Sequence, residues 1–380
     1  MSDRPIVILL PYLSCSGLEL FGLRFAQDLL ARGIPAVVAA PDDSLIAGQC
    51  YDRKIPRWEF PETKKYEPWS FPACSKMFLE LEPRAVIAFR TQMMYPIHYA
   101  RLRTGKRVPF FLFYRIGAGN YYRNDPIHRR LFRYLSAVVP NADHVKNKIC
   151  KYWAIDSEKV VCIKSGVDTR RYRPDPALRS SLRKEIGIGE GDFLIGSTGR
   201  IHPEKGSEIL LRALFASDGA AAGRKDVHLL YVGREYEPGY IDHLNSVAAQ
   251  LGVAQQFHII PFRNDIETVY SALDLFAFAV TSHETYAYVT LEAMASGVVP
   301  VVPHIGGMKE MYTDGVEGWF FEHRNTESLK KVLTKALTSS KKELVAMGGL
   351  ARQRIVEKAS WKAMMETYLD LFRRCGVDQV

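Results

Sequence analysis

Short runs of consecutive apolar residues recur along the chain and alternate with stretches in which apolar residues are three or four positions apart. A continuous apolar run is typical of a parallel strand buried on both faces, and the wider spacing is typical of a helix with one buried face. The first series of predicted strands is Ile6–Leu10, Ala36–Ala40, Ala85–Phe89, Pro109–Phe113, Ala137–Val139 and Val160–Ile163. The second series is Phe193–Ser197, Val227–Val232, Phe257–Ile260, Leu275–Ala279, Val299–Val302 and Gly318–Phe321. Alternation of strands with helices predicts an α/β protein with two doubly wound parallel sheets.

The boundary between the two domains is expected where Pro174, Asp175 and Pro176 interrupt both spacings. We therefore predict one Rossmann-like domain over residues 1–175 and a second over residues 176–359. Residues 360–374 have the pattern of an amphipathic helix, and we expect the C-terminal segment 360–380 to pack back on the first domain. Doubly wound sheets bind ligands beyond the carboxyl ends of their strands, so two such domains facing each other predict a central cleft.

Composition and charge narrow the class of protein. The chain has 380 residues, of which 47% are hydrophobic and 24% are charged, as is usual for a soluble protein. No apolar run approaches the length of about 20 residues that spans a bilayer. The six cysteines are scattered, without a Cys-x-x-Cys pair, and the N-terminus lacks the apolar core of a signal peptide. These features predict a cytoplasmic protein with reduced thiols.

The formal net charge of +9 is concentrated in the first domain. Residues 1–175 hold 28 Lys and Arg against 17 Asp and Glu. A basic surface there could face an anionic membrane, an acidic acceptor or nucleic acid, or it could be solvated without a partner.

Two turns that follow predicted strands could bind anions. After the first strand, residues 14–19 contain Gly17 and lead into a predicted helix, so backbone N–H groups at the helix start could contact an anion. After the first strand of the second domain, Arg200 and Lys205 are flanked by Gly199 and Gly206. Two cations in such a turn suit a diphosphate and can stabilise a leaving phosphate without a metal. Alternatively, Arg200 and Lys205 are solvated charges in an ordinary turn that binds no ligand.

The most specific pattern surrounds a predicted helix that starts near Tyr288 and ends at Gly297. Glu284 precedes this helix and Glu292 lies in its first turns, so the two carboxylates can reach opposite ends of one ligand. The N–H groups near Val289 and Thr290 could hold the anionic middle of that ligand. A carboxylate also suits a pair of neighbouring sugar hydroxyls. The alternative for Glu292 is a charge that merely stabilises the helix start.

Another glycine-rich turn, at Gly306 and Gly307, follows the strand Val299–Val302 and fits either a ligand contact or an ordinary turn. The chain has no Gly-x-Gly-x-x-Gly fingerprint and no Walker loop, which argues against a nicotinamide dehydrogenase or a P-loop ATPase.

Together these motifs resemble those of the retaining glycosyltransferases of family 4, which have the GT-B fold of two Rossmann-like domains. The resemblance is carried by Glu284, Glu292 and the Ala293-Met294-Ala295 run before Gly297. It extends to the Gly-Arg and Lys-Gly pairs around Arg200 and Lys205, and to Gly166-Val167-Asp168, Tyr172, Pro174 and Trp361. It is strong over the second domain and weak over the first.

The resemblance implies transfer of a sugar from a nucleotide-diphosphate sugar to an acceptor hydroxyl with retention of anomeric configuration. Arg200 and Lys205 would bind the diphosphate, Glu292 the ribose, and Glu284 the sugar near its C3 and C4 hydroxyls, while Gly17 would approach the phosphates. The other donor-binding residues implied are Gly199, Tyr286, Val289 and Thr290. No cofactor or metal is implied, and the chain has no Asp-x-Asp motif. We expect Glu284, Arg200 and Lys205 to be catalytic.

The sequence departs from the family pattern at three places, one of which is the turn after the second strand of the second domain, where Gly233-Arg234-Glu235 replaces the usual Gly-x-Gly. Thr285 and Ala287 stand where the family has glycines, and the strand that ends at Tyr114 and Arg115 lacks the usual His. Arg115, with Tyr114, is then a candidate for acceptor contact. Two mechanisms stay open: a double displacement through a carboxylate, for which Glu284 is the candidate, and a front-face attack assisted by the departing phosphate. The plentiful cations favour the second.

The acceptor is expected to be a glycan or a lipid-linked precursor in the synthesis of a cell-surface polysaccharide, lipopolysaccharide or glycolipid. Basic clusters at residues 101–107 and 123–133, with aromatic residues between them, suit peripheral contact with an anionic inner membrane face, or are solvated helices. No RNA-recognition motif is present, so no nucleic acid partner is expected. The alternatives are a sugar-nucleotide epimerase or a phosphorylase on the same fold, and an inactive binder of nucleotide sugars or polyanions.

Overall fold

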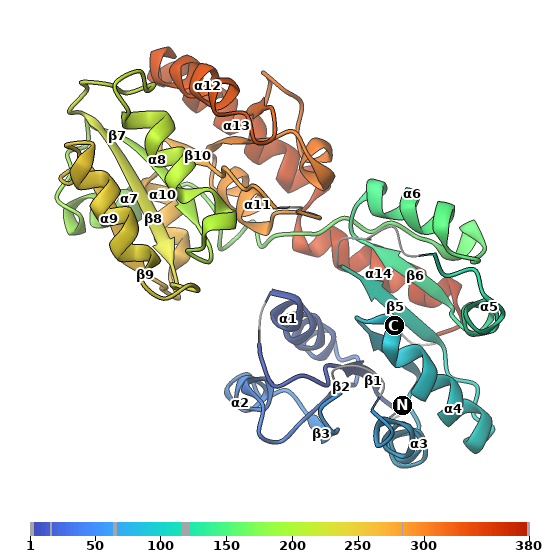
Figure 1. Cartoon of the computed structure of the whole chain (residues 1–380). Helices are drawn as coiled ribbons and strands as arrows, with labels where there is room; N and C mark the ends of the chain where they lie inside the picture. The colour runs from blue at the N-terminus through green and yellow to red at the C-terminus, as the bar shows by residue number, and fades with distance from the viewer. Residues whose placement is uncertain (1–3, 16, 64–66, 116–121, 283, 378–380) are drawn as a thin grey trace. The chain divides into compact units, whose positions relative to one another are not determined.

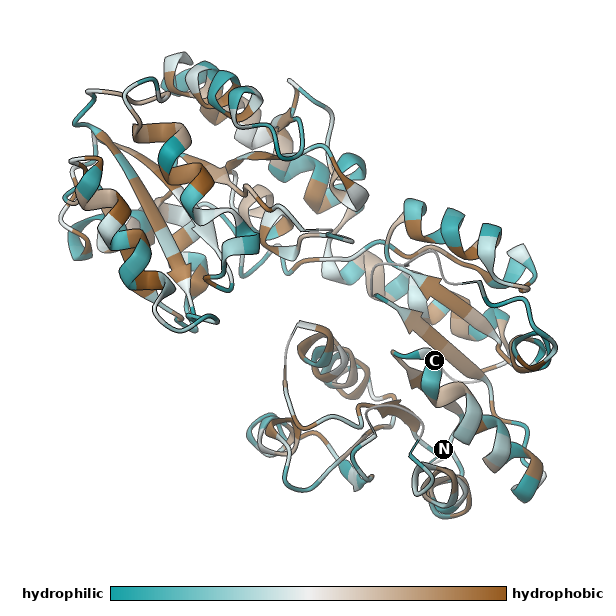
Figure 2. Cartoon of the chain, in the orientation of Figure 1, coloured by the Kyte–Doolittle hydropathy of each residue, from teal (hydrophilic) through white to brown (hydrophobic). Residues whose placement is uncertain are grey.

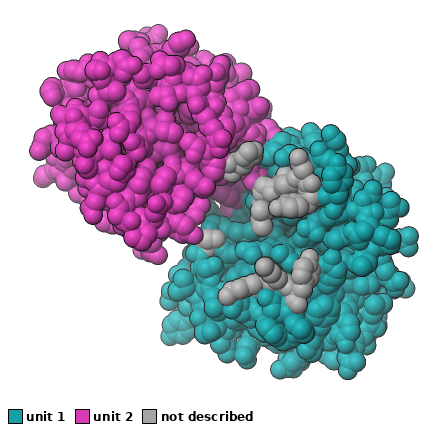
Figure 3. Space-filling model, viewed as in Figure 1, with its two compact units in different colours: residues 1–163, 366–380 teal, residues 164–365 magenta. Residues whose placement is uncertain are grey.

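The computed structural model describes residues 4–15, 17–63, 67–115, 122–282 and 284–377, and the chain divides into two compact units (Figure 1, Figure 3). Unit 1 comprises Met1–Ile163 and Glu366–Val380, and unit 2 comprises Lys164–Met365. The boundary therefore falls before the expected residue 176. The reason is that Val167 pairs with the start of the last helix: its N–H donates to the carbonyl of Ala359 at 2.9 Å, and its carbonyl accepts from Trp361 at 2.8 Å.

Unit 1 is built on a parallel sheet of six strands in the order β3-β2-β1-β4-β5-β6. The strands are β1 (Ile6–Leu9), β2 (Ala36–Ala40), β3 (Arg57–Glu59), β4 (Ala85–Ala88), β5 (Phe110–Tyr114) and β6 (Ala137–Pro140). Most of their residues are fully buried, and β5 and β6 are brown in Figure 2 because both of their faces are apolar. The chain order reverses between β1 and β4, which is the switch point where such sheets bind ligands.

Two elements of unit 1 differ from the sequence-based prediction. The edge strand β3 was not predicted, because its three residues, Arg-Trp-Glu, have no apolar run. The predicted strand Val160–Ile163 is wrong as a sheet strand, since Val160 forms a single isolated bridge with Val138. Val160 and Ile163 of that segment are buried without extending the sheet.

Helices connect the strands of unit 1. They are α1 (Gly17–Ala31), α2 (Leu45–Asp52), α3 (Ser70–Leu81), α4 (Met94–Thr104), α5 (Pro126–Arg133) and α6 (Asp143–Tyr152), with the short turns η1 (Thr91–Met93) and η2 (Ser157–Lys159). Side-chain caps fix two of the helix starts: Ser44 accepts from Ala47, and Asp125 accepts from Ile127 and His128.

The last helix, α14 (Trp361–Arg374), begins in unit 2 and ends in unit 1. In unit 1 its Tyr368 and Phe372 are fully buried against aromatic rings. The ring of Tyr368 lies 5.1 Å from that of Phe25, and the ring of Phe372 lies 4.7 Å from that of Phe111. The end of α14 is therefore part of the core of unit 1. Within the described residues, none of the helices combines the length and apolar composition that a membrane crossing requires.

Replacing Tyr368 by alanine is expected to lower the free energy of unfolding of unit 1 by about 3–5 kcal/mol, the usual cost of removing a buried aromatic ring. Urea titration followed by intrinsic fluorescence measures this loss. Tyr368→Phe keeps the ring and loses only the hydroxyl, which accepts a hydrogen bond from Arg115 at 3.2 Å, so its loss should be much smaller. Equal losses for both variants would contradict the packing role of the ring.

Unit 2 repeats the architecture, with strand order β12-β11-β10-β7-β8-β9. Its strands are β7 (Phe193–Thr198), β8 (Val227–Gly233), β9 (Phe257–Pro261), β10 (Leu275–Ala277), β11 (Val299–Pro303) and β12 (Trp319–Phe321). Its helices before α14 are α7 (Pro176–Glu185), α8 (Ser207–Phe215), α9 (Tyr240–Gln250), α10 (Ile266–Ala272), α11 (Tyr288–Ala295), α12 (Thr326–Thr338) and α13 (Lys341–Lys358), with the turns η3 (Pro203–Lys205) and η4 (Gly306–Glu310). All six predicted strands of this unit are present.

Candidate functional site

The candidate site lies at the carboxyl edge of the sheet of unit 2, at its switch point. β7 and β10 are neighbours there, while the chain continues from them to β8 on one side and to β11 on the other. The loop after β7 carries Arg200 and Lys205, and the segment after β10 carries Glu284. The sheet topology thus brings together residues that are far apart in the sequence.

Close backbone contact shapes the loop after β7. Gly199 has a φ of +128°, which favours glycine, and its carbonyl lies against Gly233, where an added Cβ would be 1.7 Å from that oxygen. Arg200 follows and is exposed. Within the described part of the chain its guanidinium forms no ion pair and stacks on the ring of Tyr236, 4.7 Å from the ring centre. Arg200 is therefore available to an anionic ligand.

Lys205 ends the same loop and is held by the segment after β10. Its ammonium forms an ion pair with the carboxylate of Glu284 and lies 5.3 Å from the ring centre of Phe278. Gly206, with a φ of +73°, packs so closely on Ala279 that a Cβ would lie 1.9 Å from the Ala279 carbonyl oxygen. Lys205 and Glu284, two predicted catalytic residues of opposite charge, are therefore in direct contact with each other.

The N-terminus of α11 belongs to the same region, and the N–H of Thr290 there donates to the carbonyl of Ala287 at 3.1 Å. Ala287 precedes the helix, and its side chain cannot cap the helix start. Thr290 is fully buried, and its Oγ1 has no hydrogen-bond partner among the described residues. Val289 is half-buried and Tyr286 is buried. A buried hydroxyl without a partner at a helix N-terminus is suited to an anionic ligand group.

Glu292 is positioned by a residue that the sequence did not reveal. The hydroxyl of Tyr270, on α10, donates to the Glu292 carboxylate at 2.8 Å and lies 2.7 Å from the hydroxyl of Thr198 at the end of β7. Burial, together with the nearby Glu292 charge, holds the pKa of Tyr270 well above its usual value, so the phenol stays protonated as a donor. The series of hydrogen bonds from Thr198 through Tyr270 therefore fixes one carboxylate oxygen of Glu292.

Replacing Tyr270 by phenylalanine is expected to lower the free energy of unfolding by about 1–3 kcal/mol, because Glu292 and Thr198 lose their shared partner in a buried setting. Urea titration measures the change. Tyr236→Phe is the matched control, since the Tyr236 side chain is exposed, and its stability should change by less than about 0.5 kcal/mol. Equal stability of Tyr270→Phe and the natural protein would show that the hydrogen-bond chain is not structural.

The segment that carries Glu284 is fixed at both ends. The N–H of Gly307 donates to the carbonyl of Thr285 at 3.1 Å, and the N–H of Thr281 donates to the carbonyl of Glu204 at 2.8 Å. The carbonyl of Thr281 accepts from Arg324 at 3.0 Å. These bonds give the glycine-rich turn of residues 306–307 a structural function. His283 of this segment lies outside the described residues.

A cavity of about 520 Å³ lies at the carboxyl ends of β8 and β9, next in the sheet to β7. Its lining includes Gly233, Arg234 and Phe262. The Phe262 ring is exposed, and the guanidinium of Arg234 lies 5.8 Å from its centre. The cavity therefore offers an aromatic face and a cation close to the Arg200 loop.

The candidate residues of unit 1 have different surroundings. Gly17 is the exposed first residue of α1, while Ser16 of the same turn lies outside the described residues. Tyr114 is buried, with its ring 5.1 Å from that of Trp153. The Arg115 guanidinium lies 3.7 Å from the ring centre of Phe21 and donates to Tyr368. Tyr114 thus contributes to packing, and Arg115 is held against α1 and α14.

A polar cluster near the switch point of unit 1 was not predicted. Arg90, directly after β4, stacks on the ring of Tyr12 at 4.3 Å, and Glu19 on α1 is buried. Within the part of unit 1 that the structure describes, the hydroxyl of Tyr12 and Nε of Arg90 are buried without hydrogen-bond partners. Burial raises the pKa of Tyr12 and keeps its hydroxyl protonated. The signal for this cluster was weak, because Tyr12 and Arg90 follow strands without a motif.

In the described part of the chain, no three His, Cys, Asp or Glu side chains are grouped closely enough to hold a metal ion.

Comparison with known proteins relates these features to two family models. The model described as Glycosyl transferases group 1 matches residues 179–354, and the model described as Glycosyltransferase Family 4 matches residues 16–171. The first match contains the Arg200 loop and α11, and the second contains Gly17 and Arg115.

Several curated relatives are D-inositol 3-phosphate glycosyltransferases. A D-inositol 3-phosphate glycosyltransferase of Rhodococcus opacus is 28% identical over 248 residues, which are 63% of this chain and 54% of that protein. A protein of the same name from Segniliparus rotundus is 30% identical over 242 residues, with 62% and 51% covered. The chain therefore spans about half the length of the curated relatives it matches.

Solved structures share the fold over nearly the whole chain. A glycosyltransferase of Rickettsia africae has a TM-score of 0.84 at 16% identity, with 99% of this chain and 100% of that chain covered. HepE of Anabaena, in complex with UDP, has a TM-score of 0.83 at 20% identity, with 97% and 100% covered. These matches and the two parallel six-stranded sheets show a GT-B fold. Because the two family models together match most of the chain, it belongs to the family 4, or group 1, glycosyltransferases.

Proposed function

We propose that this protein transfers a sugar from a nucleoside-diphosphate sugar to an acceptor hydroxyl and retains the anomeric configuration. The observation that carries the proposal is the contact between Lys205 and Glu284 beside the exposed Arg200. Two cations suit a diphosphate, and a carboxylate suits sugar hydroxyls, so one site can hold both halves of the donor. HepE of Anabaena, a structural neighbour, was solved with UDP-glucose, which supports a donor of this class.

In this proposal the diphosphate lies between the Arg200 loop and the start of α11. Arg200 and Lys205 neutralise its charge, and the N–H of Val289 and the Thr290 hydroxyl bind its oxygens. Gly199 and its positive φ let the backbone approach the phosphates closely. The same cations stabilise the negative charge that develops on the leaving diphosphate.

The Lys205–Glu284 ion pair implies an exchange of partners when the donor binds. The diphosphate takes the Lys205 ammonium, and the released Glu284 carboxylate accepts hydrogen bonds from the sugar. Glu284 is then released to orient the sugar only when the ligand also carries a diphosphate. Glu292, which Tyr270 orients through its hydrogen bond, accepts from the ribose hydroxyls.

The base of the nucleotide is proposed to occupy the cavity beyond β8 and β9. The exposed Phe262 ring provides a stacking face, and Arg234 is close to it. The cavity adjoins the Arg200 loop through the contact between Gly199 and Gly233, so a nucleotide can reach from one to the other.

The reaction is proposed to proceed by front-face attack. The acceptor oxygen attacks the anomeric carbon on the side of the departing diphosphate, one of whose oxygens takes the acceptor proton. The C–O bond to the diphosphate breaks as the new glycosidic bond forms. The protein contributes positioning and charge stabilisation and needs no metal. The two cations, Arg200 and Lys205, favour this route, because they stabilise the negative charge of the departing diphosphate.

The acceptor is proposed to bind unit 1 near the Tyr12, Glu19 and Arg90 cluster. The unpartnered Tyr12 hydroxyl and Arg90 Nε can bind sugar hydroxyls or an anionic group of a glycan. The cluster lies at the switch point of the sheet, where the fold positions ligands. Arg115, held by Phe21 and Tyr368, is proposed to support this surface, and Gly17 opens it at the start of α1.

We also propose that the protein acts in the synthesis of a cell-surface polysaccharide, lipopolysaccharide or glycolipid. In that role it would contact an anionic inner membrane surface peripherally. Arg129, Arg130 and Arg133 on α5 are exposed, and Ile127 on the same helix is exposed beside them. Such a helix presents cations and an apolar group to lipid. Phe132, expected to share this surface, is buried and stacks on Trp153 at 5.4 Å. Sedimentation with vesicles containing anionic lipid, compared with neutral vesicles, tests this contact.

The donor proposal is tested by thermal unfolding with UDP, GDP, ADP and dTDP, each with and without magnesium. A ligand at 100 times its Kd stabilises the folded protein by about 2.7 kcal/mol, which raises Tm by a few degrees. One nucleotide stabilising equally in both conditions supports a metal-independent donor site. Failure of all four at millimolar concentration would overturn it.

Turnover assays with the selected donor sugar then separate the remaining alternatives. Release of nucleotide only in the presence of a glycan or glycolipid acceptor supports transfer, and NMR of the product reports the anomeric configuration. Turnover without an acceptor would indicate an epimerase, and a requirement for inorganic phosphate would indicate a phosphorylase.

A further inference from the structure

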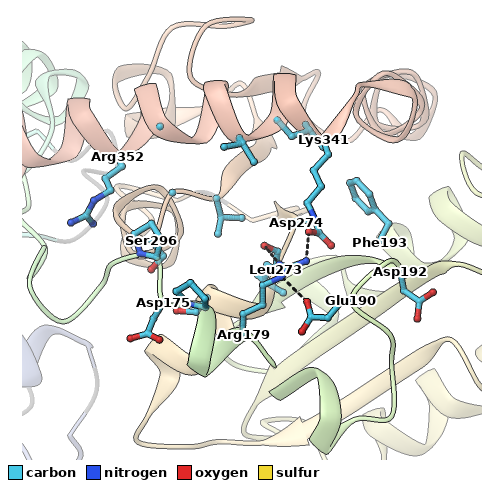
Figure 4. Close-up of a pocket in the computed structure, with 18 of the residues that line it drawn as sticks. Asp175, Arg179, Glu190, Asp192, Phe193, Leu273, Asp274, Ser296, Lys341 and Arg352 are labelled. Atoms are coloured by element: carbon cyan, nitrogen blue, oxygen red, sulfur yellow. Dashed lines mark hydrogen bonds and ion pairs between the residues drawn. The ribbon is translucent and has the colours of Figure 1, made fainter. Parts of the chain in front are cut away.

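Unit 2 contains a second large cavity, at the opposite edge of its sheet from the candidate donor site. The cavity has a volume of about 630 Å³ and lies between α7, the end of α11 and α13, beside the start of β7 and the residues that lead into β10 (Figure 4). Its volume is in the range of small-molecule sites. No role in the proposed transfer involves these residues.

The walls of the cavity are largely apolar. Pro174 and Pro176 line one side, Phe193 and Leu273 lie at the strand ends, and Val345 lies on α13. Val345 is 66% exposed, so part of this apolar surface is open to solvent. An occupant would therefore cover apolar area that the folded chain leaves uncovered.

Two neighbouring glycines on α13 differ in their surroundings, and one of them lines the cavity. Gly348 packs against Gly297, and an added Cβ there would lie 2.0 Å from the Gly297 carbonyl oxygen. Gly349 differs, because a Cβ at this position would meet no atom within 4 Å. Glycine is the least favourable ordinary residue in a helix interior, and packing does not require it at 349. Its absent side chain leaves room in the cavity.

Most charged groups around the cavity are already paired. Asp274 accepts from Arg179 at 2.8 Å and from the fully buried Arg183 at 2.9 Å. Glu190 accepts from Ser180 at 2.8 Å and pairs with Arg179. These carboxylates are therefore engaged by the chain itself.

The remaining charged groups differ in their partners. Asp175 caps α7, and Asp192 accepts from the N–H of Gly189 at 2.6 Å. Arg352 is bound to the carbonyls of Tyr172 and Ala295.

Lys341 is the exception among the cations of the lining. It is exposed at the first position of α13, and within the described residues it forms no ion pair or hydrogen bond. Figure 4 shows its side chain extending from α13 into the cavity. At the far wall, Ser296 is buried, and its Oγ has no hydrogen-bond partner in the described ranges of the chain. The cavity thus combines apolar walls with one available cation and one unsatisfied hydroxyl.

We propose that this cavity binds a small amphipathic anion, with an apolar body against the walls and a single carboxylate, sulfonate or phosphate paired with Lys341. The site is separate from the proposed donor site, because it lies at the amino ends of the strands whose carboxyl ends carry Arg200, Lys205 and Glu284. It does not depend on the proposed transferase activity.

The test is a fluorescence titration of the full chain with anilinonaphthalene sulfonate, which has an apolar body and one anionic group. We expect binding of one dye per chain, unaffected by saturating UDP. Decanoate should displace the dye, and its uncharged counterpart decanol should do so about fivefold less well, the scale of an exposed ion pair.

Two pairs of variants locate the dye. Gly349→Phe fills the cavity and should weaken binding by at least tenfold, whereas Gly48→Phe should leave it unchanged, because Gly48 is an exposed glycine of α2 that also has no atom within 4 Å of an added Cβ. Lys341→Ala should weaken binding about fivefold. Lys342→Ala removes the neighbouring exposed charge, which does not line the cavity, and should have no effect.

Three results would overturn the proposal: no dye binding, displacement of the dye by UDP, or equal affinity of Lys341→Ala and Lys342→Ala. If Gly349→Phe does not fold, the comparison of Lys341→Ala with Lys342→Ala still tests whether the dye binds in this cavity. Both lysines are exposed, and neither substitution disturbs the core.

Discussion

Replacing Lys205 by alanine is expected to lower kcat/KM about a hundredfold to a thousandfold, the effect of removing one group that stabilises charge developing in a transition state. Lys205 is held at the end of the β7 loop by Gly206 and by its ion pair with Glu284. In the proposed reaction it binds the diphosphate before and during its departure. The variant should therefore lose nucleotide affinity as well as turnover.

Steady-state kinetics and nucleotide-dependent thermal unfolding measure both losses. Lys331→Ala is the matched control, because Lys331 is an exposed lysine on α12 of the same unit, and it should behave like the natural protein. Full nucleotide-induced stabilisation of Lys205→Ala would contradict the assignment of Lys205 to the diphosphate.

Replacing Glu284 by glutamine is expected to have the opposite effect on binding. The amide keeps the size of the side chain but cannot form the ion pair, so Lys205 is free for the diphosphate. Nucleotide affinity should stay constant or rise up to about fivefold, the scale of an ion pair open to solvent. Turnover should fall about a thousandfold, because the sugar loses the carboxylate that orients it and balances its developing positive charge.

Isothermal titration with the nucleotide and single-turnover kinetics separate these two effects. Glu357→Gln, on the exposed side of α13, controls for loss of a negative charge elsewhere in the unit. Weaker nucleotide binding with unchanged turnover would reverse the proposed roles of Glu284 and Lys205. Full activity would remove Glu284 from the mechanism.

The sequence predicted the sheets well because parallel strands buried on both faces need continuous apolar runs, as in β5 and β8. It failed at the sheet edge of unit 1. β3 is partly exposed and has a polar sequence, so its pairing with β2 depends on tertiary contact. The apolar segment Val160–Ile163 was wrongly predicted to be a strand of the sheet. An apolar run indicates burial, but burial alone does not distinguish a strand from an extended segment beside a sheet.

The candidate site was predictable only where the signal is local. The cations of the β7 loop and the start of α11 could be located because glycines and helix starts mark them. The contact of Lys205 with Glu284 joins positions 79 residues apart, and spacing cannot reveal it. Tyr270 lies in a buried helix whose sequence looks like core, so its hydrogen bonds to Glu292 and Thr198 appear only in three dimensions.

The division of unit 1 into two distant segments also sets the order in which the newly made chain can fold. A ribosome releases residues 164–365, all of unit 2, before it finishes the residues that complete unit 1. Domains fold as units during synthesis, usually from the N-terminus. Here unit 1 cannot complete its core until Tyr368 and Phe372 are synthesised. Until then we expect the aromatic residues that they cover, including Phe25 and Phe111, to be exposed on the nascent chain. We therefore expect the N-terminal part of this protein to stay sensitive to proteases until synthesis of the chain is complete.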